Sequence, residues 1–304
     1  MSLSNVCQLM LLWQTRVSVL ESQLSMNQGT LYVIATPIGN RADMGERAIS
    51  VLKQVDLIAA EDTRHSKILM QHFGIDTPMQ AYHDHNEEQA TPKLILRLLA
   101  GENIALISDA GTPLLSDPGY RLVKAAHESA VKVSPIPGAC AAIAALSVSG
   151  LATDRFMFAG FPPHKQGARQ NFYREFEFQS STLVFYESSH RIVASVNDMV
   201  QVFGADKRVV LAREITKLFE TVHSAELGDL LEWLQADKNQ QKGEFVLILE
   251  GAEQQVSPQS AELSSILKVL LDELPVKQAS QMAAKITGMK KNQVYKLALE
   301  LSGK

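Results

Sequence analysis

The sequence predicts an α/β fold of two domains, with a mostly parallel N-terminal sheet, a mixed second sheet and a small helical C-terminal tail. From Thr30 onward, short apolar runs alternate with amphipathic helical stretches, as expected where crossover helices join parallel strands. The second half repeats this alternation, but the connection before Phe219 is too short for a helix, which indicates antiparallel neighbours. After Gly251 the chain first becomes polar and then helical.

The bulk composition is that of a folded protein with a substantial core. Of the 304 residues, 46% are hydrophobic and 20% are charged, which excludes a disordered chain. A net charge of −4 excludes a surface coated in basic residues but leaves room for a local basic patch. The two cysteines, Cys7 and Cys140, are far apart and lack metal-ligand spacing, so we expect a cytoplasmic protein without a disulfide framework.

The first residues are expected to lie outside the fold. The segment Val6–Leu20 is moderately apolar, but Gln14 and Arg16 interrupt it, and it is too short to span a bilayer. It also lacks the basic start of a secretory signal. Because Met26 directly precedes the first clear strand and could be the true start, residues 1–28 are interpreted as an extension that is disordered or not native.

The first α/β domain is predicted over residues 29–138. Its helical patterns include Glu88–Ala100 and Tyr120–Ala130, and prolines in PIPG end the alternation. Its strand candidates are Leu31–Ala35, Asp56–Ala60, Met79–Tyr82, Ile104–Ile107 and Val131–Pro135.

The second α/β domain is predicted over residues 139–251. Helices are expected at Gln166–Phe178, His190–Phe203 and Glu226–Ala236. The strand candidates are Phe156–Phe161, Thr182–Tyr186, Arg208–Ala212, Phe219–Ser224 and Glu244–Leu249.

Residues 252–304 are predicted to form a linker and a basic tail that resembles a helix-turn-helix. The linker is the polar stretch Ala252–Ser260, and Gly288 separates two helical stripes. The stripes comprise Ala279, Met282, Ala283 and Ile286, and then Val294, Leu297, Ala298 and Leu301. Six lysines against one glutamate from Pro275 onward are compatible with a solvated helical cap or with a nucleic-acid contact surface.

Candidate functional loops follow the predicted strands, where ligands bind in open α/β sheets. The loop Ser108–Gly119 has small residues, Ala110 and Gly111, that let a ligand approach the backbone, and prolines that stiffen it. Neither a dinucleotide-binding nor a P-loop pattern occurs in the sequence. We therefore predict a backbone cradle for a small-molecule cofactor, in which Asp117 caps the following helix.

Two further polar segments leave alternatives open. His83–Glu87 contains two histidines but no third ligand at suitable spacing, so we expect solvated loop residues or substrate contacts and no metal. Phe185–Arg191 and Ala212–Lys217 place charge at strand ends, where it either faces a cleft or forms a structural ion-pair network.

Taken together, the loops resemble the tetrapyrrole-methylase superfamily of S-adenosylmethionine-dependent enzymes, and within it the family of small-subunit rRNA methyltransferase I. The resemblance covers about Gly29 to Gly251 and extends to the lysine-rich tail. The motifs, in order, are ATPIGN (Ala35–Asn40), AEDTRHS (Ala60–Ser66), SDAGTPLLSDPG (Ser108–Gly119), PIPG (Pro135–Gly138), GFPP (Gly160–Pro163), FYESSHR (Phe185–Arg191), AREITK (Ala212–Lys217) and KGE (Lys242–Glu244).

The resemblance implies a tetrapyrrole-methylase fold with S-adenosyl-L-methionine folded between the two domains of a homodimer. The implied activity is 2′-O-methylation of a cytidine ribose in the decoding region of 16S rRNA, within the small ribosomal subunit, with no DNA or membrane partner. The cofactor-binding residues carried over by motif are Pro37, Ile38, Asp109, Ala110, Gly111, Thr112, Pro113, Pro137, Gly138, Glu187, Lys242, Gly243 and Glu244.

Transfer to a ribose hydroxyl requires alignment and the loss of a proton. Candidate groups for accepting that proton are Asp62, Glu187 and Glu214, while Arg64 and Lys217 are candidates for neutralising phosphate or alkoxide charge. An RNA-binding face is expected from the tail lysines together with Arg64, Lys165, Arg169, Arg191 and Lys217.

Two rival interpretations remain at this point. The first is a methyltransferase of the same fold that acts on a tetrapyrrole precursor, which leaves the basic tail without a role. The second is a non-catalytic nucleic-acid-binding regulator with an α/β ligand-sensing domain. Methyl transfer to any acceptor would exclude the second interpretation.

Overall fold

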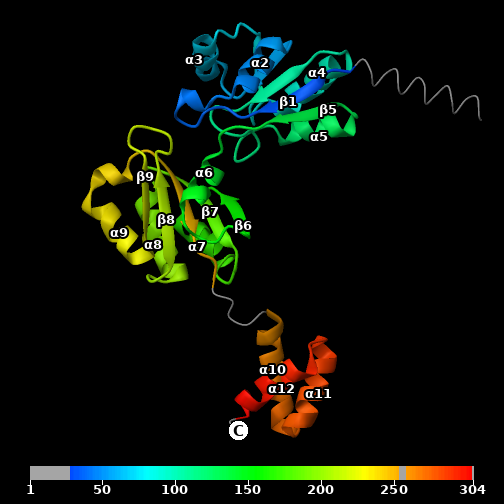
Figure 1. Ribbon diagram of the computed structural model, residues 1–304, viewed down its shortest axis with the longest axis vertical. Helices are drawn as coiled ribbons and strands as arrows, with labels where there is room; N and C mark the ends of the chain where they lie inside the picture. The colour runs from blue at the N-terminus through cyan, green and yellow to red at the C-terminus, as the bar shows by residue number, and fades with distance from the viewer. Residues whose placement is uncertain (1–27, 253–257, 303–304) are drawn as a thin grey trace, which may run out of the picture. The chain divides into compact units, whose positions relative to one another are not determined.

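The structure is a computed structural model that describes residues 28–252 and 258–302 (Figure 1). All but the last residue of the predicted N-terminal extension lies outside the described residues, as does the middle of the predicted linker. The chain forms two compact units. One holds both sheets, and the other holds the C-terminal helices together with Phe178–Ser180.

The first sheet is parallel throughout, with strand order β3-β2-β4-β1-β5. Every residue of β2 and β4 is buried, because helices cover both faces of the sheet and its central strands are therefore continuously apolar. Each predicted strand of this sheet is confirmed to within one residue at either end. The strands are β1 (Thr30–Ile34), β2 (Leu57–Ala60), β3 (Met79–Ala81), β4 (Ile104–Ile107) and β5 (Lys132–Ile136).

Two hydrophobic clusters join the helices of the first domain to opposite faces of this sheet. Leu94 and Leu122 pack against one face, and Leu52 and Met70 pack against the other. This layering leaves the carboxyl ends of the strands free to carry functional loops. The helices are the 3-10 turn η1 (Arg41–Asp43), α2 (Glu46–Gln54), α3 (Thr63–Phe73), α4 (Glu87–Leu99) and α5 (Tyr120–Glu128).

The second sheet is mixed, as predicted, with strand order β6-β7-β10-β8-β9. Strands β6 and β7 are parallel, whereas β10 is antiparallel to both of its neighbours, β7 and β8, and β9 is antiparallel to β8. The strands are β6 (Phe156–Gly160), β7 (Thr182–Ser188), β8 (Arg208–Arg213), β9 (Thr221–Glu226) and β10 (Glu244–Leu249).

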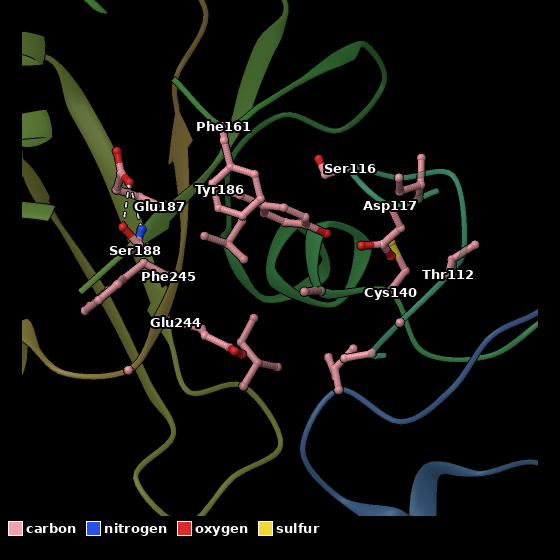
Figure 2. Close-up of a pocket in the computed structure, with 18 of the residues that line it drawn as sticks. Thr112, Ser116, Asp117, Cys140, Phe161, Tyr186, Glu187, Ser188, Glu244 and Phe245 are labelled. Atoms are coloured by element: carbon pink, nitrogen blue, oxygen red, sulfur yellow. Dashed lines mark hydrogen bonds between the residues drawn. The ribbon is translucent and has the colours of Figure 1, made fainter. Parts of the chain in front are cut away.

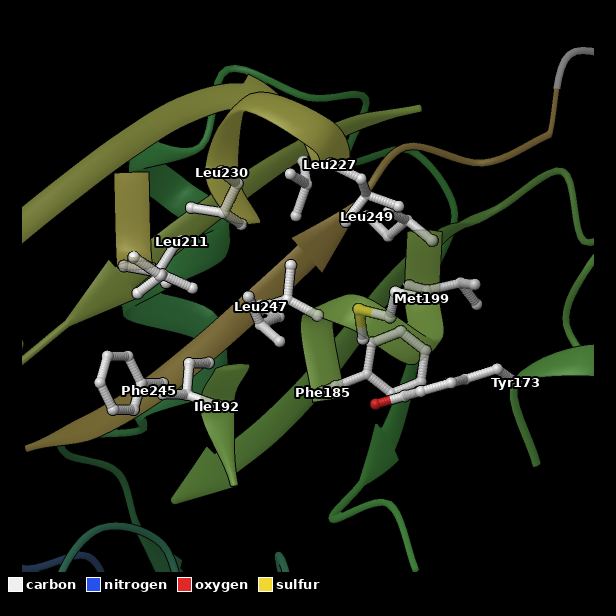
Figure 3. Packing of buried hydrophobic residues seen from close by; sticks show 14 residues of the cluster. Tyr173, Phe185, Ile192, Met199, Leu211, Leu227, Leu230, Phe245, Leu247 and Leu249 are labelled. Carbon is white, nitrogen blue, oxygen red and sulfur yellow. The ribbon is translucent and has the colours of Figure 1, made fainter. Parts of the chain in front are cut away.

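The largest core of the second domain fills the space between this sheet and three helices (Figure 3). Phe185, Leu211 and Leu247 of the strands meet Tyr173, Met199 and further side chains of the helices. The helices are α7 (Gln166–Arg174), α8 (Ile192–Phe203) and α9 (Leu227–Ala236), followed by the 3-10 turn η2 (Lys238–Gln241). The opposite face of the sheet packs against α6 (Ala141–Val148), the alanine-rich helix that follows PIPG.

The tail comprises α10 (Pro258–Glu273), α11 (Val276–Thr287) and α12 (Lys291–Leu301). The predicted linker is wrong for residues 258–260, because Pro258 starts a helix, a position where its fixed φ is compatible with the first turn. Helices α11 and α12 flank Gly288 as predicted, and Gly288 has a left-handed φ of 70°.

The predicted apolar stripe of α11 is only partly correct. Ala279 and Ala283 are buried, but Met282 and Ile286 are 51% and 61% exposed. The buried face is shifted toward Ser280 and Ala284, where α11 packs against its neighbouring helices. Of the stripe predicted in α12, Val294 and Ala298 are buried in the same cluster.

Candidate active site

Loops at the carboxyl edge of the first sheet and residues of the second domain line one cavity of about 410 Å³ (Figure 2). Its lining is more apolar than polar, as is typical of small-molecule sites. The lining residues are Ile38, Ala110, Gly111, Thr112, Leu115, Ser116, Asp117, Cys140, Ala141, Phe161, Tyr186, Glu187, Ser188, Ser189, Ile215, Gly243, Glu244, Phe245 and Val246.

The segment Ala110–Thr112 is fixed at the end of β1 by backbone hydrogen bonds. The amide of Thr36 donates to the carbonyl of Gly111 at 2.8 Å, and the amide of Gly111 donates back at 3.0 Å. Gly111 has a φ of 85°, and a Cβ there would lie 3.3 Å from Ile38 Cγ2. The hydroxyl of Thr112 donates to the carbonyl of Ala139 at 3.0 Å. The loop therefore presents its backbone at the cavity wall, as a cofactor cradle requires.

The rest of this loop reverses direction through strained backbone. Leu114 and Ser116 have φ angles of 73° and 72°, and a Cβ on Gly119 would lie 2.7 Å from Leu106 Cδ2. Gly119 is the N-cap residue of α5 and no side chain caps that helix, so the predicted capping role of Asp117 is wrong. The reversal instead places Asp117 in the cavity lining.

Burial raises the pKa of Asp117 to about 6. The negative charges of Glu61, Asp109 and Asp84 raise this pKa further, whereas the hydroxyl of Ser108 lowers it by stabilising the ionised form. Figure 2 shows the Asp117 carboxyl pointing toward Cys140 and Tyr186. Asp117 is thus a carboxyl group that titrates near neutral pH and faces a ligand-sized cavity.

Tyr186 and Phe161 form an aromatic wall of the cavity, and Phe158 packs against the Tyr186 ring. The Tyr186 ring lies 4.8 Å from Phe158 and 5.4 Å from Phe161, in edge-to-face geometry. The amide of Ala142, in the first turn of α6, donates to the phenolic oxygen at 3.1 Å. Burial, together with nearby Cys140 and Asp117, raises the pKa of Tyr186, so the phenol stays neutral.

Glu187 lines the cavity, but its carboxylate is enclosed. The side chain is 0% exposed, and Oε1 accepts from the Ser188 amide at 2.7 Å and from Arg191 at 2.7 Å. Within the described residues, Oε2 is buried without a hydrogen-bond partner. The geometry fits a group that orders the Ser188–Arg191 turn better than one exchanging protons with a ligand.

The loop Glu214–Lys217 borders the cavity through Ile215. Glu214 and Thr216 have φ angles of 51° and 67°, and Lys217 Nζ lies 2.9 Å from carboxylate oxygens of both Glu214 and Glu244. Burial opposes ionisation of Glu214, but the hydrogen bonds from Lys217 and from the Glu244 amide, together with the positive charges of Lys217 and Arg213, outweigh it and lower the pKa of Glu214. A Cβ on Gly39 would collide with Lys217 and Thr216, so this loop packs directly on the ATPIGN loop.

Asp62 and Arg64 pair with each other outside the cavity lining. Asp62 is the N-cap residue of α3, and its carboxylate accepts from the Arg64 amide at 2.8 Å and from its guanidinium at 2.7 Å. The hydrogen bond from Arg64 lowers the pKa of Asp62. A carboxylate stabilised in its ionised form is a weak proton acceptor.

Of the sequence-predicted catalytic residues, Glu187 is in the cavity lining, whereas Asp62, Arg64, Glu214 and Lys217 are not. The predicted cofactor residues in the lining are Ile38, Ala110, Gly111, Thr112, Glu187, Gly243 and Glu244. Those outside the lining are Pro37, Asp109, Pro113, Pro137, Gly138 and Lys242. Which of them contact a bound cofactor stays a prediction.

Several lining residues were not among the predicted site residues. For some of these the motifs were a usable signal, because Phe161, Tyr186 and Ile215 lie in the conspicuous GFPP, FYESSHR and AREITK segments. Asp117 lies in the predicted cradle itself, where the sequence predicts a helix cap and the structure places it in the cavity lining.

The predicted RNA-binding face is wrong for two arginines. Arg169 is buried and lies 2.6 Å from Asp198 Oδ2, and Arg191 is mostly buried beside Glu187. Both therefore belong to structural ion pairs. For Arg191 this is the alternative that the sequence leaves open, whereas for Arg169 the sequence gives no such indication. The guanidinium of Arg64 is 90% exposed.

No group of three or more His, Cys, Asp or Glu suited to holding a metal ion occurs among the described residues. His83 and His85 stack edge to face with ring centroids 5.9 Å apart. The amide of His83 donates to the side chain of Asn86 at 2.9 Å, and the segment leads into α4.

Comparison with known proteins identifies the family. Residues 30–231 match the family model Tetrapyrrole (Corrin/Porphyrin) Methylases, and residues 257–302 match the RsmI C-terminal HTH domain. A relative from Escherichia coli O157:H7, ribosomal RNA small subunit methyltransferase I, is 52% identical over 91% of this chain and 97% of its own length. The chain belongs to the ribosomal RNA small subunit methyltransferase I family. The family member from Pseudomonas aeruginosa is 50% identical over 92% of this chain and 100% of its own.

Solved methyltransferases share the fold of this family member at low sequence identity. Uroporphyrin-III-C-methyltransferase from Thermus thermophilus has a TM-score of 0.52 and 18% identity, covering 73% of this chain and 94% of its own. The methyltransferase CobJ has a TM-score of 0.55 and 16% identity, covering 76% and 98%. The predicted fold class and the resemblance to the family are confirmed. Among the described residues, no helix combines the length and apolar character needed to cross a membrane.

Proposed function

We propose that the protein transfers a methyl group from S-adenosyl-L-methionine to the 2′-hydroxyl of a cytidine ribose in the decoding region of 16S rRNA. The observation that carries the proposal is a single cavity lined by motif residues from both α/β domains, in a chain 52% identical to a ribosomal RNA small subunit methyltransferase I. The name of the E. coli relative indicates ribosomal RNA of the small subunit as the substrate. The motif resemblance implies that the acceptor is the 2′-hydroxyl of a cytidine ribose.

The residues of the cavity fit S-adenosyl-L-methionine. Gly111 has a positive φ and leaves only 3.3 Å between a Cβ position and Ile38 Cγ2, so glycine lets this backbone pack closely on Ile38 at the cavity wall. Phe161 and Tyr186 offer apolar ring surface across the cavity, and its volume lies within the usual range for ligand sites of about 300–1,000 Å³. When bound, this cofactor supplies an activated methyl group on a sulfonium ion.

Since the methyl group is already activated, the main task of the protein is alignment of the acceptor oxygen for in-line transfer. Alignment of this kind contributes about 7–11 kcal/mol in favourable cases. The strained loops at Leu114–Ser116 and Glu214–Thr216 are held by packing and by ion pairs, which suits walls that must not move during transfer.

The RNA partner is supported by the basic tail. Lys277, Lys285 and Lys291 are exposed on helices that match the RsmI C-terminal HTH domain, whereas the chain as a whole is acidic. We extend the proposal to a homodimer that acts in the cytoplasm on 16S rRNA in the small ribosomal subunit, as the resemblance implies.

A tetrapyrrole precursor is the second candidate acceptor, since this fold also serves uroporphyrin-III-C-methyltransferase. The identity to that enzyme is 18%, against 52% to the rRNA methyltransferase, and a tetrapyrrole acceptor leaves the basic helices unexplained. A non-catalytic regulator with a ligand-sensing domain would also use the cavity, but it would not account for the match of the chain to methyltransferases.

The deciding experiment incubates the protein and methyl-labelled S-adenosyl-L-methionine with small ribosomal subunits that lack the modification, and maps ribose methylation on the 16S rRNA. Label at one cytidine ribose in the decoding region is the expected result. A tetrapyrrole precursor incubated in parallel should remain unlabelled. Label in the tetrapyrrole and none in RNA would refute the proposed function, and no label in any acceptor would favour the regulator.

A further inference from the structure

Besides the thiol of Cys140, the cavity lining contains three carboxyl groups and one phenol that could exchange a proton with a ligand, those of Asp117, Glu187, Glu244 and Tyr186. The carboxylate of Glu187 is enclosed and bonded to Arg191, and Glu244 is 80% exposed and paired with Lys217 at 2.9 Å. The phenol of Tyr186 accepts from the Ala142 amide and stays neutral, because burial raises its pKa. Asp117 lies in the wall of the cavity, and no Lys, Arg or His is among the described residues that line it.

We propose that Asp117 is the catalytic base, and that its carboxylate takes the proton of the acceptor hydroxyl during methyl transfer. The inference rests on the proposed function and adds a residue with a defined role. In the step, the acceptor oxygen forms a bond to the methyl carbon while the carbon–sulfur bond breaks. Sulfur keeps that electron pair and leaves as a neutral thioether, and the hydroxyl proton moves to a carboxylate oxygen of Asp117.

The position of Asp117 is fixed by its neighbours in the chain. Ser116 on one side has a φ of 72°, and Gly119 is confined between Leu106 and Leu114, so packing holds the backbone that carries Asp117 at the cavity wall. Facing it in the lining are Cys140, which directly precedes α6, and Tyr186 of β7. On the first-domain side, Glu61, Asp84 and Asp109 contribute negative charge, and Ser108 a hydroxyl.

This environment makes Asp117 a better base than an ordinary carboxylate. Burial and the three acidic neighbours raise its pKa to about 6, so near neutral pH the group is mostly ionised yet retains appreciable proton affinity. Asp62, by contrast, is paired with Arg64, which lowers its pKa and its proton affinity.

The test measures single-turnover methyl transfer to small-subunit rRNA by wild-type protein and by Asp117→Asn, at saturating cofactor and across about pH 5 to 8. The wild-type rate should rise with pH through about pH 6 and then level off. The Asp117→Asn rate should fall by about 100-fold or more and lose this rise, while calorimetry shows unchanged cofactor affinity. An Asp117→Asn rate close to that of the wild type overturns the proposal, as does a loss confined to cofactor affinity.

Asp84→Asn is the matched control, since it removes one of the neighbouring charges at an exposed position outside the cavity lining. It should keep the plateau rate and move the rise in rate to lower pH, because less negative charge faces Asp117. A merely structural role of Asp117 would not produce that shift, so an unchanged pH profile contradicts the proposal even if Asp117→Asn fails to fold.

A second readout needs no cofactor or RNA and separates this inference from the proposed function. Because folding raises the pKa of Asp117, its contribution to stability is present below about pH 4 and is lost as pH rises through about 6. Asp117→Asn should therefore unfold at a higher urea concentration than wild type near pH 8 and at about the same concentration near pH 4. Equal midpoints at both pH values would show that Asp117 is not the perturbed group. Failure of the proposed function would leave this result intact.

Discussion

Leu114, Ser116, Glu214 and Thr216 lie in the loops around the cavity, and each holds a positive φ angle. A positive φ angle costs of order 1–3 kcal/mol for each residue other than glycine, so contacts with the surrounding structure must hold these residues in that conformation. For Glu214 and Thr216 these contacts are visible: the Lys217 ion pairs, and a hydrogen bond from the Thr216 amide to Glu220 at 2.6 Å. The backbone of the Glu214–Thr216 wall is thus stabilised by ion pairs and hydrogen bonds around it.

Gly243 offers a direct test of this arrangement. Its φ is 102°, and a Cβ there would lie 2.6 Å from Glu214 side-chain atoms, so Gly243→Ala must displace Glu214 and strain the backbone. We expect this variant to lose about 1–3 kcal/mol of unfolding free energy in urea titrations. Gly167→Ala is the control, since Gly167 is exposed within α7 with nothing near its Cβ, and should gain about 0.5–1 kcal/mol. Equal effects of the two changes would show that the Glu214 loop is not constrained as described.

The site residues that could be predicted from the sequence are those in loops that directly follow predicted parallel strands. Ile38 and Ala110–Thr112 follow parallel strands, and such loops must meet at one edge of the sheet. Asp117 was missed because Asp-Pro-Gly before a helix is typical of a cap, whereas the left-handed backbone at Leu114 and Ser116 that turns it into the cavity leaves no sequence signature. Arg169 was misjudged because its partner Asp198 lies on a different helix, 29 residues away.

Helix α4 contains buried and exposed leucines that contribute very differently to stability. Leu98 is 0% exposed in the core of the first domain, whereas Leu96, two residues earlier on the same helix, is 67% exposed. Positions two apart face different directions on a helix, so the same residue type serves core and solvent.

The pair supports a matched prediction. Leu98→Ala should lower the unfolding free energy by about 2–5 kcal/mol, through lost burial and a residual cavity. Leu96→Ala should change it by less than about 0.5 kcal/mol, because alanine is the better helix former and little packing is lost. Urea unfolding of both variants under one condition makes the comparison, and a Leu96→Ala loss as large as that of Leu98→Ala would contradict the packing of α4 described above.

The elements that could be predicted are those whose burial pattern is simple. Strands β2 and β4 are wholly buried apolar runs, and β9 alternates half-buried and exposed residues as an edge strand does. Helix α10 was missed because its first residues are polar and include Pro258, features shared by linkers and by first helical turns. Sequence pattern does not distinguish these two uses of proline.

At the scale of the whole molecule, charge is distributed unevenly. The chain carries a net charge of −4, yet the tail from Pro275 onward has six lysines and one glutamate. Since an acidic protein is repelled by RNA on average, binding must depend on such concentrated basic surface. Because Arg169 and Arg191 are buried in ion pairs, the tail lysines, Arg64 and Lys165 remain as exposed candidates for that surface.

Neutralising the tail should therefore weaken RNA binding and reduce its dependence on salt. The substituted lysines, each replaced by glutamine, are Lys277, Lys285, Lys290, Lys291 and Lys296, all exposed. A control with the same change in net charge replaces exposed lysines of the other unit, namely Lys53, Lys67, Lys93, Lys132 and Lys238.

For each tail lysine that contacts a phosphate, the slope of log K against log salt should become shallower by about 0.7–0.9, because fewer counterions are released. The control should keep a slope near that of the wild type, measured by fluorescence anisotropy with 16S rRNA. The two variants lose the same amount of positive charge, so they differ only if the tail lysines themselves contact phosphates. If the slope becomes equally shallow in both variants, net charge and not the tail governs binding.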